Sequence, residues 1–297
     1  GIELAAGAVV DPVTTVVDAG ATMLVNGIYN GTADADTFTL SGTLAGDGTI
    51  DLLDGDDTLT MNTGSDVTFT GVFDANAASS DRFVLSGAGE DSFDASLIGT
   101  VFLNFDEFRK EGAGTWRLTG SGAQHWNVAE GTLIGDSTSL AGDIDNAATV
   151  IFDQATDGSY DGVLSGSGTL IKQNSGTLAM TATHAFAGDT QIQSGTLQVD
   201  GVLPGMISVA SGGTLSGVGT VTNVTALAGG VVAPGNPTSP FGTLTIAGNY
   251  DGAGTVRINT ELGDETSATS RLVIRGNVTG ASTVLVNRTG GDGAATT

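Results

Sequence analysis

A short pattern recurs along most of the chain: a glycine, then a threonine, then an apolar residue. Its glycines are Gly42, Gly48, Gly99, Gly114, Gly131, Gly168, Gly176, Gly195, Gly213, Gly219, Gly242 and Gly254. Glycine suits a tight turn because it has no Cβ, and threonine followed by an apolar residue favours a strand. Each copy therefore predicts a turn that leads directly into a short β-strand.

The copies are most evenly spaced in the second half of the chain. Leu178, Leu197, Leu215 and Val232 follow one another at intervals of 19, 18 and 17 residues. A period of about 20 residues made of short strands, with no helix between them, is typical of a solenoid. Leucine-rich repeats need an Asn or Cys ladder that this chain lacks, and WD40 blades need about 40 residues each. We therefore predict a parallel β-solenoid with these four side chains stacked in its core.

The composition supports an all-β class. Of 297 residues, 47 are Gly, 39% are hydrophobic and none is Cys. Val, Leu, Ile and Thr suit strands, and no sustained helical spacing of apolar residues occurs. The alternation in Thr37-Phe38-Thr39-Leu40 predicts one buried face per strand. The lack of cysteine excludes disulfide scaffolds and cysteine nucleophiles, and no apolar run approaches the ~18 residues of a membrane-spanning helix.

The charge of the chain is strongly negative. The formal net charge is −24, and residues 1–108 carry 18 Asp and Glu but a single basic residue, Arg82. Binding to nucleic acid needs clustered Lys and Arg, and an anionic membrane surface would repel such a chain. We interpret the acidic residues as a solvated face that keeps the protein soluble.

The composition changes near residues 233–241, which hold three of the five prolines. Proline cannot donate to a central strand ladder, so this stretch is predicted to be a loop. Alternating segments follow at 243–247, 255–259, 271–274 and 283–287. We predict a solenoid over residues 1–235 and a C-terminal β cap over residues 236–297, in which Leu272 and Ile274 share a buried face.

Three sequence lines carry a family resemblance. Residues 105–120 read FDEFRKEGAGTWRLTG, residues 164–172 read LSGSGTLIK, and residues 186–199 read FAGDTQIQSGTLQV. They resemble the passenger-associated repeats of pertactin-like autotransporters, with Phe186 where that family usually has tyrosine. Residues 207–276 are similar to the run into the family's autochaperone region, and residues 271–276, RLVIRG, stand where the family usually has D-x-L-x-V-x-G. The likeness covers residues 100–297 well and the first 100 only in style.

The resemblance implies a right-handed single-stranded parallel β-helix that ends in an autochaperone cap. It also implies export to the cell surface or the extracellular space of a Gram-negative bacterium, through a C-terminal outer-membrane β-barrel that is missing from this sequence. Such passengers act in adhesion, virulence or self-association. The expected partner is a host cell-surface or matrix molecule, or the same protein on neighbouring bacteria.

Two acidic turns approach the calcium-binding nonapeptide of repeat proteins. The first contains Asp54 and Asp57, and the second contains Asp91. Asp57, Asp74 and Asp91 are also spaced evenly by 17 residues, which would let them stack on one edge. Calcium takes about six to eight oxygens, which repeat proteins supply from consecutive turns, but the two acidic turns are too far apart to be adjacent. We expect solvated acidic turns and no metal site.

Enzymatic alternatives have weaker support. Asp56-Asp57 offers a carboxylate pair for a carbohydrate-active β-helix, a polysaccharide hydrolase or lyase, but residues 1–81 contain no Lys, Arg or His. Ser137 lies in a line that resembles a GDSL esterase opening, yet without the strand–turn–helix setting.

The remaining candidate residues have ordinary structural interpretations. His125 and His184 are expected in turns or on the surface, and Trp116 and Trp126 are expected to pack in the core rather than to stack on sugars. We predict no catalytic residue and no cofactor, and a non-enzymatic adhesin or self-association stalk.

Overall fold

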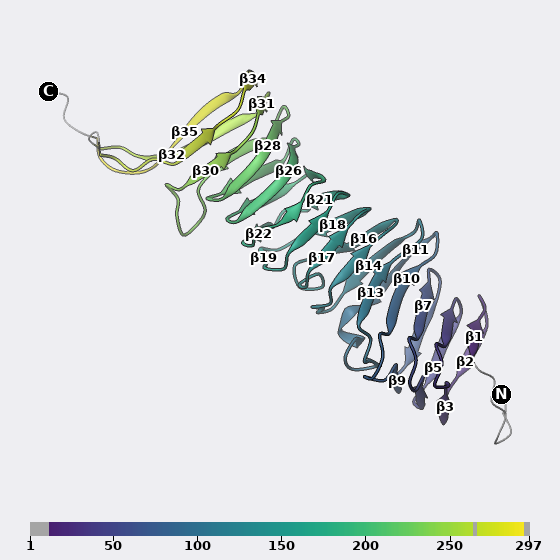
Figure 1. The fold of residues 1–297 in the computed structure, drawn as a ribbon. Coiled ribbons are helices and arrows are strands. Elements are labelled where there is room, and N and C mark those ends of the chain that lie inside the picture. The colour runs from purple at the N-terminus through teal and green to yellow at the C-terminus, as the bar shows by residue number, and fades with distance from the viewer. Residues whose placement is uncertain (1–11, 264–265, 294–297) are drawn as a thin grey trace. The chain divides into compact units, whose positions relative to one another are not determined.

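The computed structural model describes residues 12–263 and 266–293. Within them the chain forms 35 β-strands and one short 3-10 helix, η1 (Ala95–Leu97). The strands are stacked in parallel, turn upon turn, so the predicted all-β parallel solenoid is confirmed (Figure 1). The chain divides into two compact units, one that ends at Ile134 and one that begins at Gly135. None of the described residues forms a helix that is long and apolar enough to cross a membrane.

Four parallel stacks make up the first unit. The first stack contains β1 (Thr14–Val17), β4 (Thr37–Leu40), β7 (Thr58–Asn62), β10 (Arg82–Ser86), β13 (Glu107–Lys110) and β15 (Trp126–Val128). The second contains β2 (Thr22–Leu24), β5 (Thr43–Gly46) and β8 (Asp66–Phe69). The third contains β3 (Ile28–Asn30), β6 (Thr49–Asp51), β9 (Val72–Asp74) and β12 (Phe102–Leu103), and the fourth β11 (Glu90–Asp94), β14 (Thr115–Thr119) and β16 (Thr132–Gly135).

Phenylalanine fills the centre of the first unit. Phe38, Phe73, Phe83 and Phe102 are at most 1% exposed. The ring centroids of Phe38 and Phe73 lie 5.2 Å apart, and those of Phe83 and Phe102 lie 5.4 Å apart, both in edge-to-face geometry. Such pairs contribute about 0.5–1.5 kcal/mol each beyond the burial of their area. In β4 the threonine at the first position is exposed and Phe38 is buried, which confirms the predicted alternation.

Three parallel sheets make up the second unit. Sheet I contains β17 (Ile144–Asn146), β20 (Leu164–Gly166) and β23 (Ala185–Phe186). Sheet II contains β18 (Thr149–Asp153), β21 (Thr169–Gln173), β24 (Asp189–Ile192), β26 (Val202–Val209), β28 (Thr220–Ala226), β30 (Thr243–Ile246) and β33 (Arg271–Ile274), with β31 (Tyr250–Gly252) and β34 (Val278–Gly280) continuing from β28. Sheet III contains β19 (Gly158–Tyr160), β22 (Thr177–Met180), β25 (Gly195–Val199), β27 (Gly213–Gly217), β29 (Val231–Pro234), β32 (Thr255–Glu261) and β35 (Thr283–Gly290).

The predicted leucine stack is the core of sheet III. Leu178 pairs with Leu197, Leu197 with Leu215, and Leu215 with Val232 on successive strands. All four side chains are fully buried. Because parallel pairing places equivalent residues directly above one another, a single inward position in each turn builds a continuous apolar column.

The turn glycines are required by the close approach of successive turns. Eleven of the twelve predicted copies begin a strand; the exception is Gly99, where β12 starts only at Phe102. At Gly219 a Cβ would collide with the carbonyl oxygen of Gly201. That same oxygen accepts the N–H of Thr220 at 2.9 Å. The Gly-Thr pair is therefore explained by one contact: the threonine N–H bonds a carbonyl that leaves no room for a side chain one residue earlier.

The last turns differ from expectation in two places. Pro234 is buried and ends β29 instead of lying in the loop, which spans residues 235–242. Leu272 and Ile274 do share one face of β33, which ends its path in sheet II and pairs with β30, but they are only half-buried. Truncation of either side chain therefore removes less buried area than a core position would. The predicted boundary at 235/236 lies inside the second unit and remains a prediction.

The leucine column predicts that truncating an inward side chain lowers the free energy of unfolding much more than truncating an outward one. Leu197→Ala should reduce the free energy of unfolding by about 2–5 kcal/mol, because it opens a cavity in the column. Met206→Ala, on the outward side of β26 at 51% exposure, should change it by less than about 0.5 kcal/mol. Urea denaturation followed by far-UV circular dichroism measures both, and equal effects would contradict the stacked core.

Candidate functional site

A buried lysine closes a turn in the second unit. The ammonium of Lys172, at the end of β21, has no exposed surface. It donates to the backbone carbonyls of Gln173 (2.8 Å), Asn174 (2.8 Å) and Ser194 (3.2 Å). An ammonium has three N–H donors and no acceptor, so these three carbonyls satisfy it completely. The side chain thereby ties its own turn to the turn that follows.

The same arrangement occurs in the first unit. Lys110, also fully buried, donates to the carbonyls of Glu111 (2.7 Å), Gly112 (2.8 Å) and Glu130 (3.1 Å). Burial lowers the pKa of both lysines, that of Lys172 to about 8, and neighbouring carboxylates partly oppose the shift. With a pKa of about 8, Lys172 is mainly protonated at neutral pH. Both lysines lie in sequence segments that resemble the family repeats, but their burial and their hydrogen bonds were not predicted.

A column of aspartates runs along one edge of the first unit. The backbone N–H of Asp36 donates to the carboxylate of Asp57 at 2.7 Å, that of Asp57 to Asp81 at 2.8 Å, and that of Asp81 to Asp106 at 3.2 Å. Asp36, Asp57 and Asp81 are almost completely buried. We call these four residues the aspartate ladder. It satisfies backbone donors where the strands of the first stack begin, but it also places like charges close together.

Asp57 is the most perturbed group of the ladder. Its Oδ1 accepts a hydrogen bond, but its buried Oδ2 has no partner among the described residues. Burial raises the pKa of Asp57 to about 7, opposed by the hydrogen bond from the Asp36 N–H and reinforced by repulsion from the carboxylates of Asp81, Asp36 and Asp56. Burial likewise raises the pKa of Asp81. A proton on Asp57 therefore relieves a charge that the structure does not neutralise.

Asp57, Asp74 and Asp91 do not stack on one edge, and Asp57 is fully buried instead of lying in the solvated turn that the sequence predicts. Asp57 stacks with Asp36 and Asp81, whereas Asp74 lies on β9 beside Asp51, and Asp91 on β11 accepts the N–H of Gly64. The spacing of 17 residues fails because the turns of this unit are longer, about 21 to 25 residues apart in the ladder.

The calcium candidates do not converge on one point. Asp54 is exposed and accepts a hydrogen bond from the Asn76 side chain, whereas Asp57 accepts from the Asp36 N–H and Asp91 from the Gly64 N–H. No cluster of three metal-ligating side chains occurs within residues 12–263 and 266–293. The absence of a metal site stays a prediction.

The candidate catalytic groups are separated in the same way. Asp56 is exposed and accepts the N–H of Ser80, whereas Asp57 is buried in the ladder, so the two adjacent carboxylates have different partners and are not both open to a substrate. Arg82, the basic residue nearest in sequence, is engaged by Glu107 at 2.9 Å. This arrangement does not offer a carboxylate pair beside a cation in an open cleft.

The two histidines differ from each other. His125 is exposed, as expected. His184 lies just before β23 and is 3% exposed, so a surface position is wrong for it. Its Nδ1 accepts the N–H of Leu164 at 3.1 Å, its ring stacks on Tyr160, and burial lowers its pKa to about 4. His184 is thus a neutral packing residue. Ser137 hydrogen-bonds the Gln154 side chain and not a histidine.

Both tryptophans are core residues, as expected. Trp116 and Trp126 are each 1% exposed. The Nε1 of Trp116 donates to the Ser86 carbonyl at 2.8 Å, and the ring of Trp126 packs on Phe108 with centroids 5.7 Å apart. Neither ring is available to stack on a ligand.

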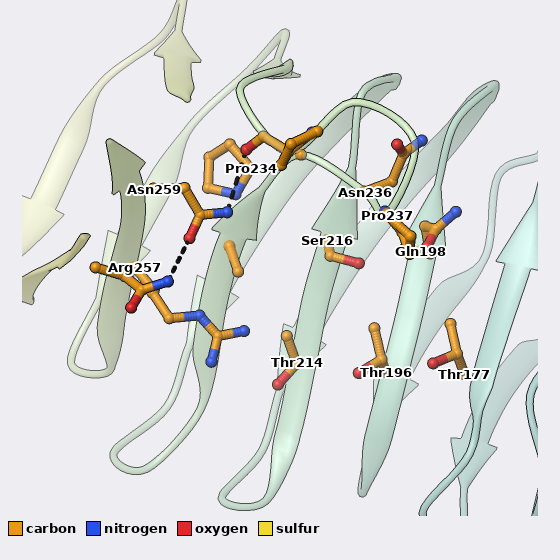
Figure 2. A pocket seen from close by; sticks show the side chains of 14 residues that line it. Thr177, Thr196, Gln198, Thr214, Ser216, Pro234, Asn236, Pro237, Arg257 and Asn259 are labelled. Atoms are coloured by element: carbon orange, nitrogen blue, oxygen red, sulfur yellow. Dashed lines mark hydrogen bonds between the residues drawn. The ribbon is translucent and has the colours of Figure 1, made fainter. Parts of the chain in front are cut away.

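The outer face of sheet III carries an open groove. It has a volume of about 360 Å³ and is floored by outward side chains of β22, β25, β27, β29, β32 and β35. Thr177, Thr196 and Thr214 occupy equivalent positions on successive strands and form one row. Gln198 and Ser216 form a second, parallel row (Figure 2). Pockets of this size accommodate small ligands or segments of larger ones.

Loop 235–242 forms one wall of the groove and is fixed at both ends. At its start, the Asn236 amide donates to Asp200 at 2.9 Å, and the same carboxylate accepts hydrogen bonds from Val218 and Gln198. At its end, the Asn259 amide donates to the carbonyl of Pro240 at 3.1 Å (Figure 2). These contacts explain why an eight-residue connection with two prolines holds one position over the sheet.

Arg257 is the one charged side chain in the groove lining. It follows the buried Val256 on β32 and is therefore directed outward and exposed. Figure 2 shows its guanidinium extending towards the threonine row. None of the ion pairs found in the described part of the chain involves it. Sequence analysis missed this site, although the threonine of each Gly-Thr pair was the signal for its floor.

Two family models match the chain. Residues 216–297 match the Autochaperone Domain Type 1, and residues 108–134 and 170–199 match the Passenger-associated-transport-repeat. Lys110 and Lys172 are each the third residue of a matched repeat, so the buried ammonium is a shared feature of both copies. The autochaperone match begins on β27, before the predicted cap boundary.

Two relatives illustrate what the chain is similar to. The adhesin BmaC autotransporter of Brucella suis biovar 1 is 34% identical over 182 residues, which cover 57% of this chain and 5% of the adhesin. An extracellular serine protease of Serratia marcescens is 40% identical over 88 residues, which cover 30% of this chain and 8% of the protease. The chain thus spans less than a tenth of either relative. No solved structure matches it.

The aspartate ladder predicts that mild acid stabilises the first unit. The pKa of Asp57 is about 7 in the folded protein, above its ordinary value of 3.8, so between these values the folded state holds a proton that the unfolded chain has released. This stabilisation is complete below pH 3.8 and is lost as the pH rises through 7. The free energy of unfolding should therefore increase as the pH is lowered from 7 towards 3.8.

Tryptophan fluorescence reports this unit selectively, because the chain's two tryptophans, Trp116 and Trp126, both lie in it. Asp57→Asn is neutral at every pH and should remove most of the increase. Asp47→Asn, at an exposed position outside the ladder, should leave it unchanged. A pH profile that is the same in Asp57→Asn and in the parent protein would show that Asp57 is not the responsible group.

Proposed function

Because this chain belongs to the autotransporter passengers, which Gram-negative bacteria export to their surface or surroundings, we propose that it is a non-catalytic adhesive segment. The observation that carries the proposal is the groove of sheet III: an open, polar, pre-formed surface supported by a rigid column of buried leucines. The likeness to an adhesin over more than half of the chain supports the same function.

Inward side chains stabilise the solenoid and outward side chains face the surroundings, and this separation supports an adhesive role. The groups that stabilise the solenoid, such as Leu197, Lys172 and the turn glycines, are buried between turns. The outward positions, such as Thr196 and Thr214, bear little of the core packing and remain available for contact with a partner. The proposed partner is a molecule of the host surface or matrix, or the same protein on a neighbouring cell.

Catalysis is the rival function, either on a polysaccharide or, as the name of one relative describes, on proteins. The side chains best suited to acid–base catalysis are buried and make structural contacts. Asp57 is sealed in the aspartate ladder, and His184 is buried against Tyr160 with one ring nitrogen bonded to the backbone. These placements favour binding over turnover.

The test is retention of the purified chain on an array of glycans, matrix proteins and the chain itself. We expect binding to at least one surface, with no hydrolysis of casein or of the polysaccharides on the array. Thr214→Trp fills the groove and should weaken that binding at least fivefold. Thr245→Trp places the same bulk on β30, outside the groove, and should leave it unchanged. Binding to no surface, or turnover of an arrayed substrate, would refute the proposal.

A further inference from the structure

We propose that the groove beneath loop 235–242 binds an acidic glycan, with the guanidinium of Arg257 holding the carboxylate of a sugar residue. This inference rests on the adhesive function proposed above and adds to it the chemical class of the ligand. It depends on three features of the groove: the charge of its lining, the repetition of its neutral polar groups, and the hydrogen bonds that its backbone already makes within the sheet.

The charge of the lining is the reverse of the charge of the chain. The net charge is −24, yet no acidic side chain lines the groove and one guanidinium does. Residues 135–297 carry a net charge of −8 (13 acidic against 5 basic), whereas residues 1–134 carry −16 (20 acidic against 4 basic). An exposed arginine without an ion-pair partner can form two parallel hydrogen bonds to a carboxylate. The net charge of the second unit therefore repels an anion less than that of the first unit does, and the Arg257 guanidinium attracts it locally.

The neutral polar groups repeat at the spacing of the solenoid. Thr177, Thr196 and Thr214 present one hydroxyl per turn, about 4.8 Å apart along the stack. Gln198 adds an amide beside this row, and Asn287 adds another towards the end of the sheet. Hydroxyl and amide groups both donate and accept hydrogen bonds, which matches the hydroxyl groups of a sugar chain. A glycan lying along the stack would meet a similar set of partners at each turn.

The backbone of the groove favours a glycan over an extended peptide. Peptides that add to a sheet are bound mainly by main-chain hydrogen bonds at an exposed edge. The floor strands β25, β27 and β29 are each paired on both sides within sheet III, so their N–H and C=O groups are already used. Recognition here has to come from side chains. No aromatic residue lines the groove, so the ligand is held by hydrogen bonds and charge.

Isothermal titration calorimetry with matched sugars tests the inference. The probes are tetragalacturonate, a glucuronate-containing tetrasaccharide and a sialylated oligosaccharide, each compared with its methyl ester, which has the same skeleton without the charge. We expect at least one acid to bind and its ester to bind at least tenfold more weakly. Arg257→Gln should lower affinity for that acid at least tenfold, about 1.4 kcal/mol. Thr196→Val should lower it several-fold.

Arg275→Gln is the matched control, because Arg275 is exposed in the same unit but does not line the groove. It should bind the acid as the parent chain does. Equal binding of acid and ester, unchanged affinity in Arg257→Gln, an equal loss in Arg275→Gln, or no binding of any acid would overturn the inference. Retention on neutral glycans or matrix proteins alone would overturn it while leaving the adhesive function intact, whereas retention on no surface would remove both.

Discussion

Parallel hydrogen bonding between successive turns is the interaction on which the rest of this structure depends. It places equivalent residues of neighbouring turns directly above one another, so whatever occupies a position is repeated along the stack. Repetition turns Leu178, Leu197 and Leu215 into a continuous apolar column. It turns the neighbouring outward threonines into the floor of a groove. Core and candidate binding surface are thus two faces of the same strands, set by the alternation of side chains.

Repetition also concentrates buried charge, and the buried lysines and the buried aspartates accommodate it differently. Lys110 and Lys172 are single cations, each fully satisfied by three backbone carbonyls. The aspartate ladder of the first unit instead places Asp57 and Asp81 one turn apart, and Asp57 keeps an unpaired buried oxygen. A buried charge is tolerated when its hydrogen bonds are complete, and otherwise it tends to be neutralised by a proton. The lysines therefore fasten turns, whereas the ladder makes stability depend on pH.

Much of the fold was predictable from the sequence, because the solenoid is specified locally. The Gly-Thr copies marked strand starts, and the spacing of Leu178, Leu197, Leu215 and Val232 identified the core column, since both depend on residues within one turn. The candidate site was harder to predict from the sequence. The placement of Asp57, the burial of His184 and the fixing of loop 235–242 by Asp200 and Asn259 depend on turns whose lengths differ, and no local pattern encodes these contacts. Arg257 could be recognised as a candidate binding residue only once the structure showed that it lines the groove.

Hydrogen–deuterium exchange of Lys172→Met, compared with the parent chain and with Arg271→Met, tests most directly whether each turn is held by its neighbours. Methionine keeps the apolar stem but leaves the carbonyls of Gln173, Asn174 and Ser194 without their donor. The account predicts loss of protection at the amides of Gly176, Gly195 and Thr196, which bond neighbouring turns, with residues 12–134 unchanged. Arg271 is exposed, and its replacement should change nothing. Exchange that is unaltered near residue 172, or faster throughout both units, would contradict it.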